Sequence, residues 1–245
     1  MIFHFYGFIV GTATIVGYLL AEKKAIKSGI EEKIFFKNFF YIFLAGVFGA
    51  RAWHVFTDLY LYKENLIQVL YIWNGGLSIL GAVFGGLVAL YFLEKDKKRL
   101  RIYLDSIVFG LPIAQAIGRW ANFVNQELYG LPTNLPWKIF IDYQNRVAGF
   151  DKFSYFHPLF LYEGILVVVA FLIMSYLLKK KIWKVGGGRF FTFYLLYYGI
   201  IRFFLDFLRI DRINWYGLGT NQWVIISLEF LFIIYWIVKK CRKKY

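Results

Sequence analysis

Apolar residues occur along this chain in seven long blocks, which shorter polar stretches separate. The blocks run roughly over residues 2–21, 38–58, 76–94, 102–124, 157–178, 189–208 and 221–238. Each is close to the ~20 residues that an α-helix needs to cross the hydrocarbon core of a bilayer. Backbone polar groups in that core must be satisfied within the segment, which favours helices. The pattern therefore predicts an all-α polytopic membrane protein with seven transmembrane helices.

The polar stretches alternate between rich and poor in lysine and arginine. Basic clusters lie within 23–37, 95–101, 179–189 and 239–244, whereas the connection 59–75 carries only Lys63. Positively charged loops of membrane proteins are retained on the cytoplasmic side. We therefore expect the N-terminus outside and the C-terminus in the cytoplasm.

One connection, at about 125–156, is much longer than the others and falls on the outer side in this topology. Its prolines and aromatic residues, such as Pro132, Trp137 and Phe140, make it too apolar for a disordered linker. Long ordered loops are often functional, so we expect a small extracytoplasmic cap on the membrane surface. No linker rich in Pro, Gly or Ser divides the chain, and we predict a single transmembrane domain over 1–245.

Composition agrees with a membrane protein. Hydrophobic residues make up 60% of the chain, whereas soluble domains usually have about 45–50%. The formal net charge is +14, and because it lies in short loops we assign it to anionic lipid headgroups and not to nucleic acid. The single cysteine, Cys241, excludes an internal disulfide. The first block has no basic segment before it, so we interpret it as a retained span and not as a cleaved signal peptide.

Charged side chains interrupt several blocks, and in the predicted topology they lie toward the outer ends. The arginines concerned are Arg51, Arg119 and Arg202. A charge in hydrocarbon is costly and is usually functional, and the planar guanidinium suits phosphate. We therefore predict one polar cavity that opens to the outer leaflet and binds a lipid phosphate. In the structural alternative, each arginine pairs with Glu127, Glu163 or Asp206 and only holds helices together.

The densest polar stretch closes the fourth block and reads Gly118-Arg-Trp-Ala-Asn-Phe-Val-Asn-Gln-Glu-Leu-Tyr-Gly130. It resembles the signature of the prolipoprotein diacylglyceryl transferase family, whose members catalyse the first step of bacterial lipoprotein maturation. Other matching pieces occur in the same order along essentially the whole chain. They are Tyr6-Gly7, Gly49-Ala-Arg51, Gly75-Gly76, His157-Pro158, Leu161-Tyr-Glu-Gly164, Tyr198-Gly-Ile-Ile-Arg202, Asp206 and Arg209.

The resemblance implies an enzyme that moves the diacylglyceryl group of phosphatidylglycerol to the lipobox cysteine of a preprolipoprotein. The reaction forms a thioether and releases glycerol phosphate. The reacting thiol belongs to the substrate, so Cys241 has no catalytic role in this interpretation. We expect a multi-pass protein of the bacterial inner membrane whose active site faces the outer leaflet, with no cofactor.

The resemblance also assigns roles to individual residues. The catalytic residues it implies are Arg119, Arg202, Glu127 and Asn122. The substrate-binding residues it implies are Tyr6, Arg51, Asn125, Tyr198 and Asp206. The first two arginines would bind the phosphate and stabilise charge on the departing glycerol phosphate, which is often a large catalytic contribution. Glu163 and Asp206 would hold arginines in place.

The chain departs from the family at Leu80, where members carry a histidine that is often proposed as the base. Two interpretations follow. The thiol is activated by nearby positive charge, since a free thiol has a pKa near 8.5 and is partly ionised at neutral pH. Alternatively, the chain is an inactive or divergent member that binds or moves anionic phospholipid.

The three histidines add little chemistry. His54 lies one turn after Arg51 and could serve as a base, but we favour an interfacial or hydrogen-bonded role. His157 precedes Pro158 and is expected to be structural, and His4 is expected at the membrane interface. Scattered histidines without a cysteine partner argue against a metal site. An anion transporter would need polar groups along a full crossing path, and the inner halves of the blocks are apolar.

Overall fold

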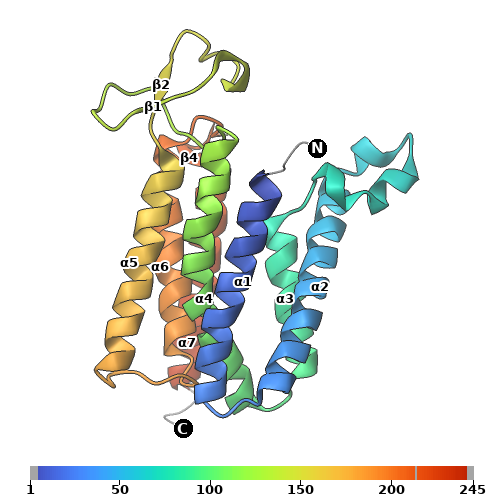
Figure 1. Cartoon of the computed structure of the whole chain (residues 1–245), viewed down its shortest axis with the longest axis vertical. Helices are drawn as coiled ribbons and strands as arrows, with labels where there is room; N and C mark the ends of the chain where they lie inside the picture. Colours follow the sequence, from blue (N-terminus) through green and yellow to red (C-terminus); the bar gives the residue numbers. More distant parts are fainter. Residues whose placement is uncertain (1–4, 213, 242–245) are drawn as a thin grey trace. The chain divides into compact units, whose positions relative to one another are not determined.

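The computed structural model of the chain describes residues 5–212 and 214–241, so His4 lies outside the described residues. Seven α-helices occur in this part of the chain, one for each predicted block (Figure 1). They are α1 (Phe5–Lys27), α2 (Glu32–Thr57), α3 (Ile79–Leu93), α4 (Lys97–Val124), α5 (Leu159–Lys179), α6 (Arg189–Leu205) and α7 (Thr220–Cys241).

Five of the described helices are long and apolar enough to cross a membrane. They are α1, α2, α4, α5 and α6 together with the 3-10 turn that follows it, and α3 is a shorter apolar helix. The predominantly helical membrane architecture is therefore confirmed. The count of seven crossings and the sidedness of the termini stay predictions.

Helix bounds differ from the apolar blocks mainly where polar turns continue a helix. α2 begins at Glu32 and not near 38, because hydropathy marks only the apolar part of a helix that extends into a charged turn. α3 begins at Ile79 because Gly75 and Gly76 adopt positive φ angles of 83° and 68°. That backbone conformation is open to glycine and stops a right-handed helix from starting earlier.

Short elements fill the connections. Between α2 and α3 lie three 3-10 helices, η1 (Leu59–Tyr62), η2 (Leu66–Leu70) and η3 (Ile72–Asn74). Between α4 and α5 lie β1 (Ile139–Phe140), η4 (Tyr143–Asn145) and β2 (Tyr155–Phe156). After α6 follow η5 (Asp206–Leu208), β3 (Asn214–Trp215) and β4 (Leu218–Gly219).

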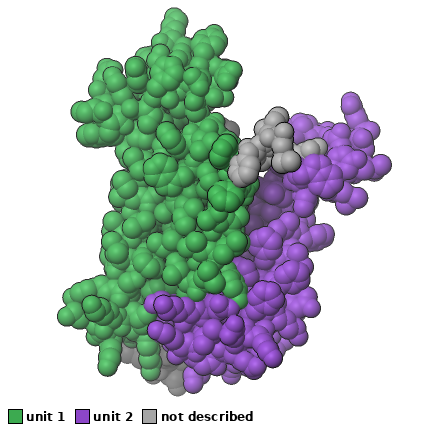
Figure 2. Space-filling view, in the orientation of Figure 1, with its two compact units in different colours: residues 1–21, 107–184, 189–245 green, residues 22–106, 185–188 purple. Residues whose placement is uncertain are grey.

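The contacts divide the chain into two compact units (Figure 2). Unit 1 comprises residues 1–21, 107–184 and 189–245, and unit 2 comprises 22–106 and 185–188. The single domain expected from the sequence stays a prediction.

Unit 2 is built on the pair α2 and α3, which approach closely through glycines. A Cβ atom at Gly49 would lie 2.5 Å from the carbonyl oxygen of Gly81 and 3.1 Å from Cα of Gly85. Helices in lipid gain much of their association energy from such close backbone packing. These glycines therefore have a structural role in the packing of α2 on α3.

Replacing Gly49 by valine should force α2 and α3 apart. We expect a loss of roughly 1–3 kcal/mol, the usual range for overpacking, visible as a lower unfolding temperature in detergent. Gly11→Val is the matched control, because a Cβ at Gly11 meets nothing within 4 Å. An equal fall in both variants would contradict the packing role of Gly49.

The predicted cap is a small folded layer in unit 1. β1 and β2 pair antiparallel, with Ile139 opposite Phe156 and Phe140 opposite Tyr155. Tyr129, Ile141 and Phe156 form its buried core. The indole of Trp137 donates to the Tyr162 hydroxyl of α5 at 2.6 Å, and the backbone N–H of Gly130 donates to the carbonyl of His157 at 2.8 Å. The cap is thus tied to the start of α5, above the ends of α4 and α5 in Figure 1.

Candidate active site

The polar signature occupies the end of α4 and the turn that follows it. The Glu127 N–H donates to the carbonyl of Asn122 at 2.9 Å, and the flanking Gln126 and Leu128 have φ angles of 52° and 55°. These left-handed residues reverse the chain directly after the helix. The reversal brings Glu127 back to the helix it has just left, where its Oε1 accepts from Asn122 Nδ2 at 2.8 Å.

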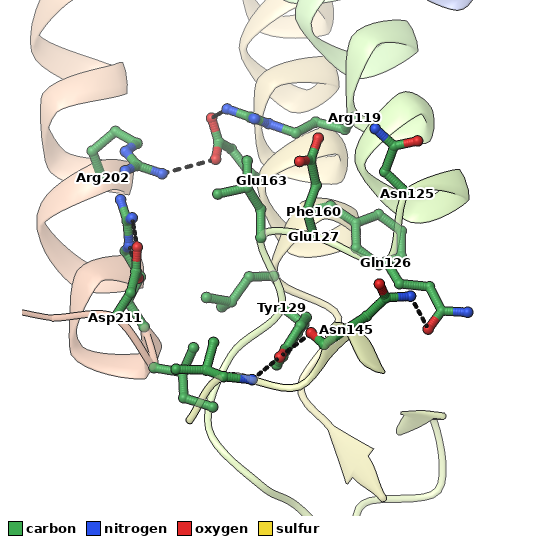
Figure 3. Close-up of a pocket in the computed structure, with 15 residues that line it drawn as sticks. Arg119, Asn125, Gln126, Glu127, Tyr129, Asn145, Phe160, Glu163, Arg202 and Asp211 are labelled. Atoms are coloured by element: carbon green, nitrogen blue, oxygen red, sulfur yellow. Dashed lines mark hydrogen bonds and ion pairs between the residues drawn. The ribbon is translucent and has the colours of Figure 1, made fainter. Parts of the chain in front are cut away.

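Two arginines from separate helices meet on one carboxylate of a third helix (Figure 3). Arg119 of α4 donates through Nη2 to Glu163 Oε1 on α5. Arg202 of α6 donates through Nη1 to Glu163 Oε2 at 3.0 Å. Figure 3 shows the two side chains reaching Glu163 from opposite sides. The carboxylate is therefore shared, and the three groups together carry one formal positive charge.

Further hydrogen bonds fix this cluster. The Tyr198 hydroxyl of α6 donates to Glu163 Oε1 at 2.8 Å, and Arg119 Nη1 donates to Asn122 Oδ1 at 3.1 Å. A continuous series of hydrogen bonds thus links Arg202 through Glu163, Arg119 and Asn122 to Glu127. Buried ionic groups are tolerated when their hydrogen bonds are satisfied in this way.

The cluster is buried on one side and open on the other. Glu163 is 4% exposed, whereas the side chains of Arg119 and Arg202 are 20% and 22% exposed. The exposed parts of both arginines border a cavity of about 250 Å³. We call it the arginine cavity. It is lined by Arg119, Asn125, Gln126, Glu127, Leu128, Tyr129, Asn145, Val147, Leu159, Phe160, Glu163, Arg202, Arg209, Ile210 and Asp211.

A second ion pair lines the arginine cavity. Arg209 donates to both carboxylate oxygens of Asp211, at 2.9 and 2.5 Å. The hydrogen bond from Arg209 is the main reason that the pKa of Asp211 lies below its ordinary value. The same bond raises the pKa of Arg209. The Asp211 side chain is 51% exposed, so this pair is more accessible to water than the one on Glu163.

The Asp211 pair should make a pH-dependent contribution to stability. Because its pKa is lower in the folded protein, the contribution is complete above the ordinary value of 3.8 and is lost as the pH falls through the folded value. We expect Asp211→Asn to lower the free energy of unfolding at neutral pH by at most about 1 kcal/mol, because the pair is so exposed. The change should be visible as a slightly lower unfolding temperature. The difference from the unsubstituted protein should vanish at low pH. A difference that grew on acidification would contradict this assignment.

Most residues predicted from the sequence for the site meet in this region. Arg119, Arg202, Glu127 and Asn125 line the arginine cavity, and Asn122 and Tyr198 bond directly to residues that do. Asp206 lies beside it without lining it: the side chain is 1% exposed, its Oδ1 accepts from Asn221 Nδ2 at 3.3 Å, and Arg209 Nε lies 3.9 Å away. Tyr6, on α1, is 44% exposed and is not among the lining residues.

Arg51 lies in unit 2, where backbone carbonyls hold it. Its guanidinium donates to the carbonyl oxygens of Gln68, Val69, Gly75 and Gly76 at 2.5, 2.8, 2.8 and 3.0 Å. The side chain thus fixes the connection between α2 and α3. His54, one turn later, contacts the Tyr62 hydroxyl through Nδ1 at 3.1 Å. Leu80, in the first turn of α3, is 46% exposed.

Some lining residues were missed by the sequence analysis, notably Asp211, Tyr129 and Phe160. Asp211 had one available signal, since it is an acid two residues after Arg209, which is itself one of the residues that match the family. Phe160 gave none, because one phenylalanine in an apolar helix resembles every other.

A family model for prolipoprotein diacylglyceryl transferase matches residues 1–238. The chain belongs to this family. Proteins named phosphatidylglycerol–prolipoprotein diacylglyceryl transferase are similar along most of its length. That of Fervidobacterium nodosum is 33% identical over 228 residues, which cover 92% of this chain and 77% of the relative. That of Thermotoga petrophila is 36% identical over 211 residues, covering 85% and 71%. That of Synechocystis is 34% identical over 230 residues, covering 92% and 81%.

As a member of the prolipoprotein diacylglyceryl transferase family, this protein is a transferase of lipoprotein biosynthesis. This membership also agrees with the resemblance found in the polar signature, whose residues form part of the wall of the arginine cavity.

Proposed function

We propose that this protein transfers the diacylglyceryl group of phosphatidylglycerol to the lipobox cysteine thiol of a preprolipoprotein. The names of its relatives support the two substrates. The observation that carries the proposal is the pair of guanidinium groups from α4 and α6 that border one cavity and share a single carboxylate. A guanidinium group can donate two parallel hydrogen bonds to the oxygens of one phosphate, in a bidentate arrangement.

In the proposed reaction, the thiolate sulfur attacks the glyceryl carbon that bears the phosphate ester oxygen. A carbon–sulfur bond forms, the carbon–oxygen bond breaks, and its electron pair remains on the phosphate of the departing glycerol phosphate. The leaving group thereby gains negative charge, and Arg119 and Arg202 stabilise it. Fixed donors directed at developing charge commonly contribute a large part of catalysis.

The thiol proton is the other charge to be handled. A free thiol is partly ionised at neutral pH, and neighbouring guanidinium groups favour the thiolate further. This allows the reaction to proceed with Leu80 in place of a histidine. The proton leaves to water at the mouth of the cavity, where the lining is most exposed.

The remaining site residues have supporting roles in the proposal. Asn122 and Glu127 orient Arg119 and the headgroup, while Asn125 and Tyr198 contact the bound lipid or the residues that hold it. Glu163 and Asp206 position arginines. Arg209 offers a third phosphate donor once the half-exposed Asp211 turns toward water. Tyr6 and Arg51 are proposed to contact substrate.

We further propose a bacterial inner-membrane protein with seven crossings, the N-terminus outside and the cavity facing the outer leaflet. The support is the alternation of basic and non-basic connections in the sequence. Phosphatidylglycerol of that leaflet then reaches the arginines without crossing the bilayer. Cysteine labelling of single positions in intact cells tests this sidedness.

The decisive test mixes purified protein, phosphatidylglycerol and a lipobox peptide and follows the peptide mass. We expect a mass gain of one diacylglyceryl group, and no gain for the peptide with serine in place of cysteine. Binding of phosphatidylglycerol without any thioether would instead support the divergent, lipid-binding family member that Leu80 suggested.

A further inference from the structure

A second cavity, of about 240 Å³, adjoins the arginine cavity. We call it the cap cavity. Its walls come from the last turn of α4, the signature turn, strand β1 and the start of α5. Gln126, Glu127 and Phe160 line both cavities, so one layer of side chains separates them. Figure 3 shows these three residues together beside Arg119.

The two cavities differ in their linings. The arginine cavity has three arginines in its wall, whereas among the described residues no lysine or arginine lines the cap cavity. Its other walls include Phe123, Val124, Ile139 and Phe140. The amide groups near it are already engaged, since Asn122 bonds to Glu127 and Gln126 bonds to Asp142. The cap cavity is therefore suited to an apolar group and not to a phosphate.

The apolar walls are partly uncovered in the structure. Val124 is 49% exposed and Phe140 is 53% exposed. Apolar surface that faces an outer cap is stabilised when another apolar group covers it, at roughly 25 cal/mol per Å². Small pockets with apolar walls beside a few polar groups are the usual form of ligand sites.

The position of the cap cavity identifies its occupant. If the arginine cavity faces the outer leaflet, as proposed, a lipid whose phosphate lies at Arg119 and Arg202 would extend its acyl chains along the apolar helices, away from the cap. The cap cavity lies on the other side of Glu127, between the end of α4 and a cap strand. A polypeptide whose thiol reaches the arginine cavity passes this point, and one residue of extended chain spans about 3.3–3.6 Å.

We propose that the cap cavity receives an apolar side chain of the acceptor polypeptide, a few residues from its reacting thiol. This inference rests on the proposed function, because it assumes a peptide acceptor at the arginine cavity. The cap cavity then contributes to the choice of peptide, while the arginine cavity holds the phosphate of the donor.

The test changes the size of the cap cavity and measures the two substrates separately. Val124→Trp fills it from an exposed position, and Phe140→Ala enlarges it. Phe153→Trp is the matched control: Phe153 is an aromatic residue of the same cap, is 48% exposed and lines neither cavity. Each variant is assayed with phosphatidylglycerol and with peptides in which every residue near the cysteine is changed in turn between alanine and leucine.

We expect Val124→Trp to raise the KM for one leucine-bearing peptide by roughly tenfold or more, the effect typical of a lost apolar contact. The KM for phosphatidylglycerol should change less than about twofold, because the substitution leaves the contacts of this substrate unchanged. When that leucine is replaced by alanine, the KM of Val124→Trp for the peptide should return most of the way to the value of the unsubstituted protein. Phe140→Ala should lower the KM for peptides with larger side chains at the same position. Phe153→Trp should leave every value near that of the unsubstituted protein.

Three results would overturn the inference. One is a rise in the KM for phosphatidylglycerol in Val124→Trp, which would make the cavity an acyl-chain site. The second is an equal effect of Val124→Trp on all peptides, and the third is an equal effect of Phe153→Trp. If the unsubstituted protein formed no thioether at all, the proposed function itself would fail, which is a distinguishable outcome.

Discussion

Replacement of Arg119 or Arg202 by alanine should lower the rate of lipid transfer about a hundredfold to a thousandfold. This is the usual consequence of removing one fixed donor directed at developing charge. Each arginine contributes one of the two guanidinium groups that border the arginine cavity and bond to Glu163. The measurement is the initial rate of thioether formation by purified variants, with phosphatidylglycerol and peptide both at saturation.

The conservative variants separate catalysis from helix association. Arg119→Lys and Arg202→Lys keep the positive charge but lose the planar fork, so we expect them to fold and to lose most activity. Arg212→Ala is the control: Arg212 bonds to the carbonyl of Gly217 and does not line the arginine cavity. If the arginines only joined helices, activity would fall in proportion to the unfolding temperature, and the lysine variants would remain active.

Replacement of Glu163 by alanine should have the largest effect on stability, a loss of roughly 3–5 kcal/mol. The carboxylate is 4% exposed and is the shared partner of two guanidinium groups. Its removal leaves these two like charges close together without their counter-ion. Unfolding in mixed micelles, followed by denaturant titration, measures the change.

A double variant and a control make this prediction specific. Arg202→Ala in the Glu163→Ala background should recover part of the lost stability, because it removes one of the two opposed charges. Glu229→Ala is the control for loss of a carboxylate from a neighbouring helix. Its Oε1 is buried without a hydrogen-bond partner among the described residues, so its removal should be neutral or stabilising. Additive effects of the two substitutions at 163 and 202 would show that the carboxylate does not couple the helices.

The helices and the main site residues could be predicted because each followed from a strong local signal. A block of ~20 apolar residues has few alternatives to a spanning helix. Arg119 and Arg202 stood out because a charged side chain in an apolar block is energetically costly and is usually functional. Their common depth on two helices was enough to place them together, but not to show that Glu163 would join them from a third.

The parts that the sequence did not predict depend on contacts between distant segments. Arg51 gave the same signal as the other two arginines, yet its donors are taken by carbonyl groups of the connection 68–76. Every residue has a backbone carbonyl, so the sequence does not show which of them accept hydrogen bonds from an arginine. The cap cavity was equally hidden, because its walls combine the last turn of α4 with strand β1, which the chain reaches only after the long turn.

The carboxylate shared between α4 and α6 has a consequence for handling the protein. An anion that enters the arginine cavity interacts with the same two cations that hold α4, α5 and α6 to one another, so ligand occupancy and bundle cohesion are thermodynamically linked. Any species that binds only the folded form raises its resistance to denaturation by mass action. Extraction that strips anionic lipid would therefore yield a looser bundle, and replenishing such lipid during purification would tighten it again.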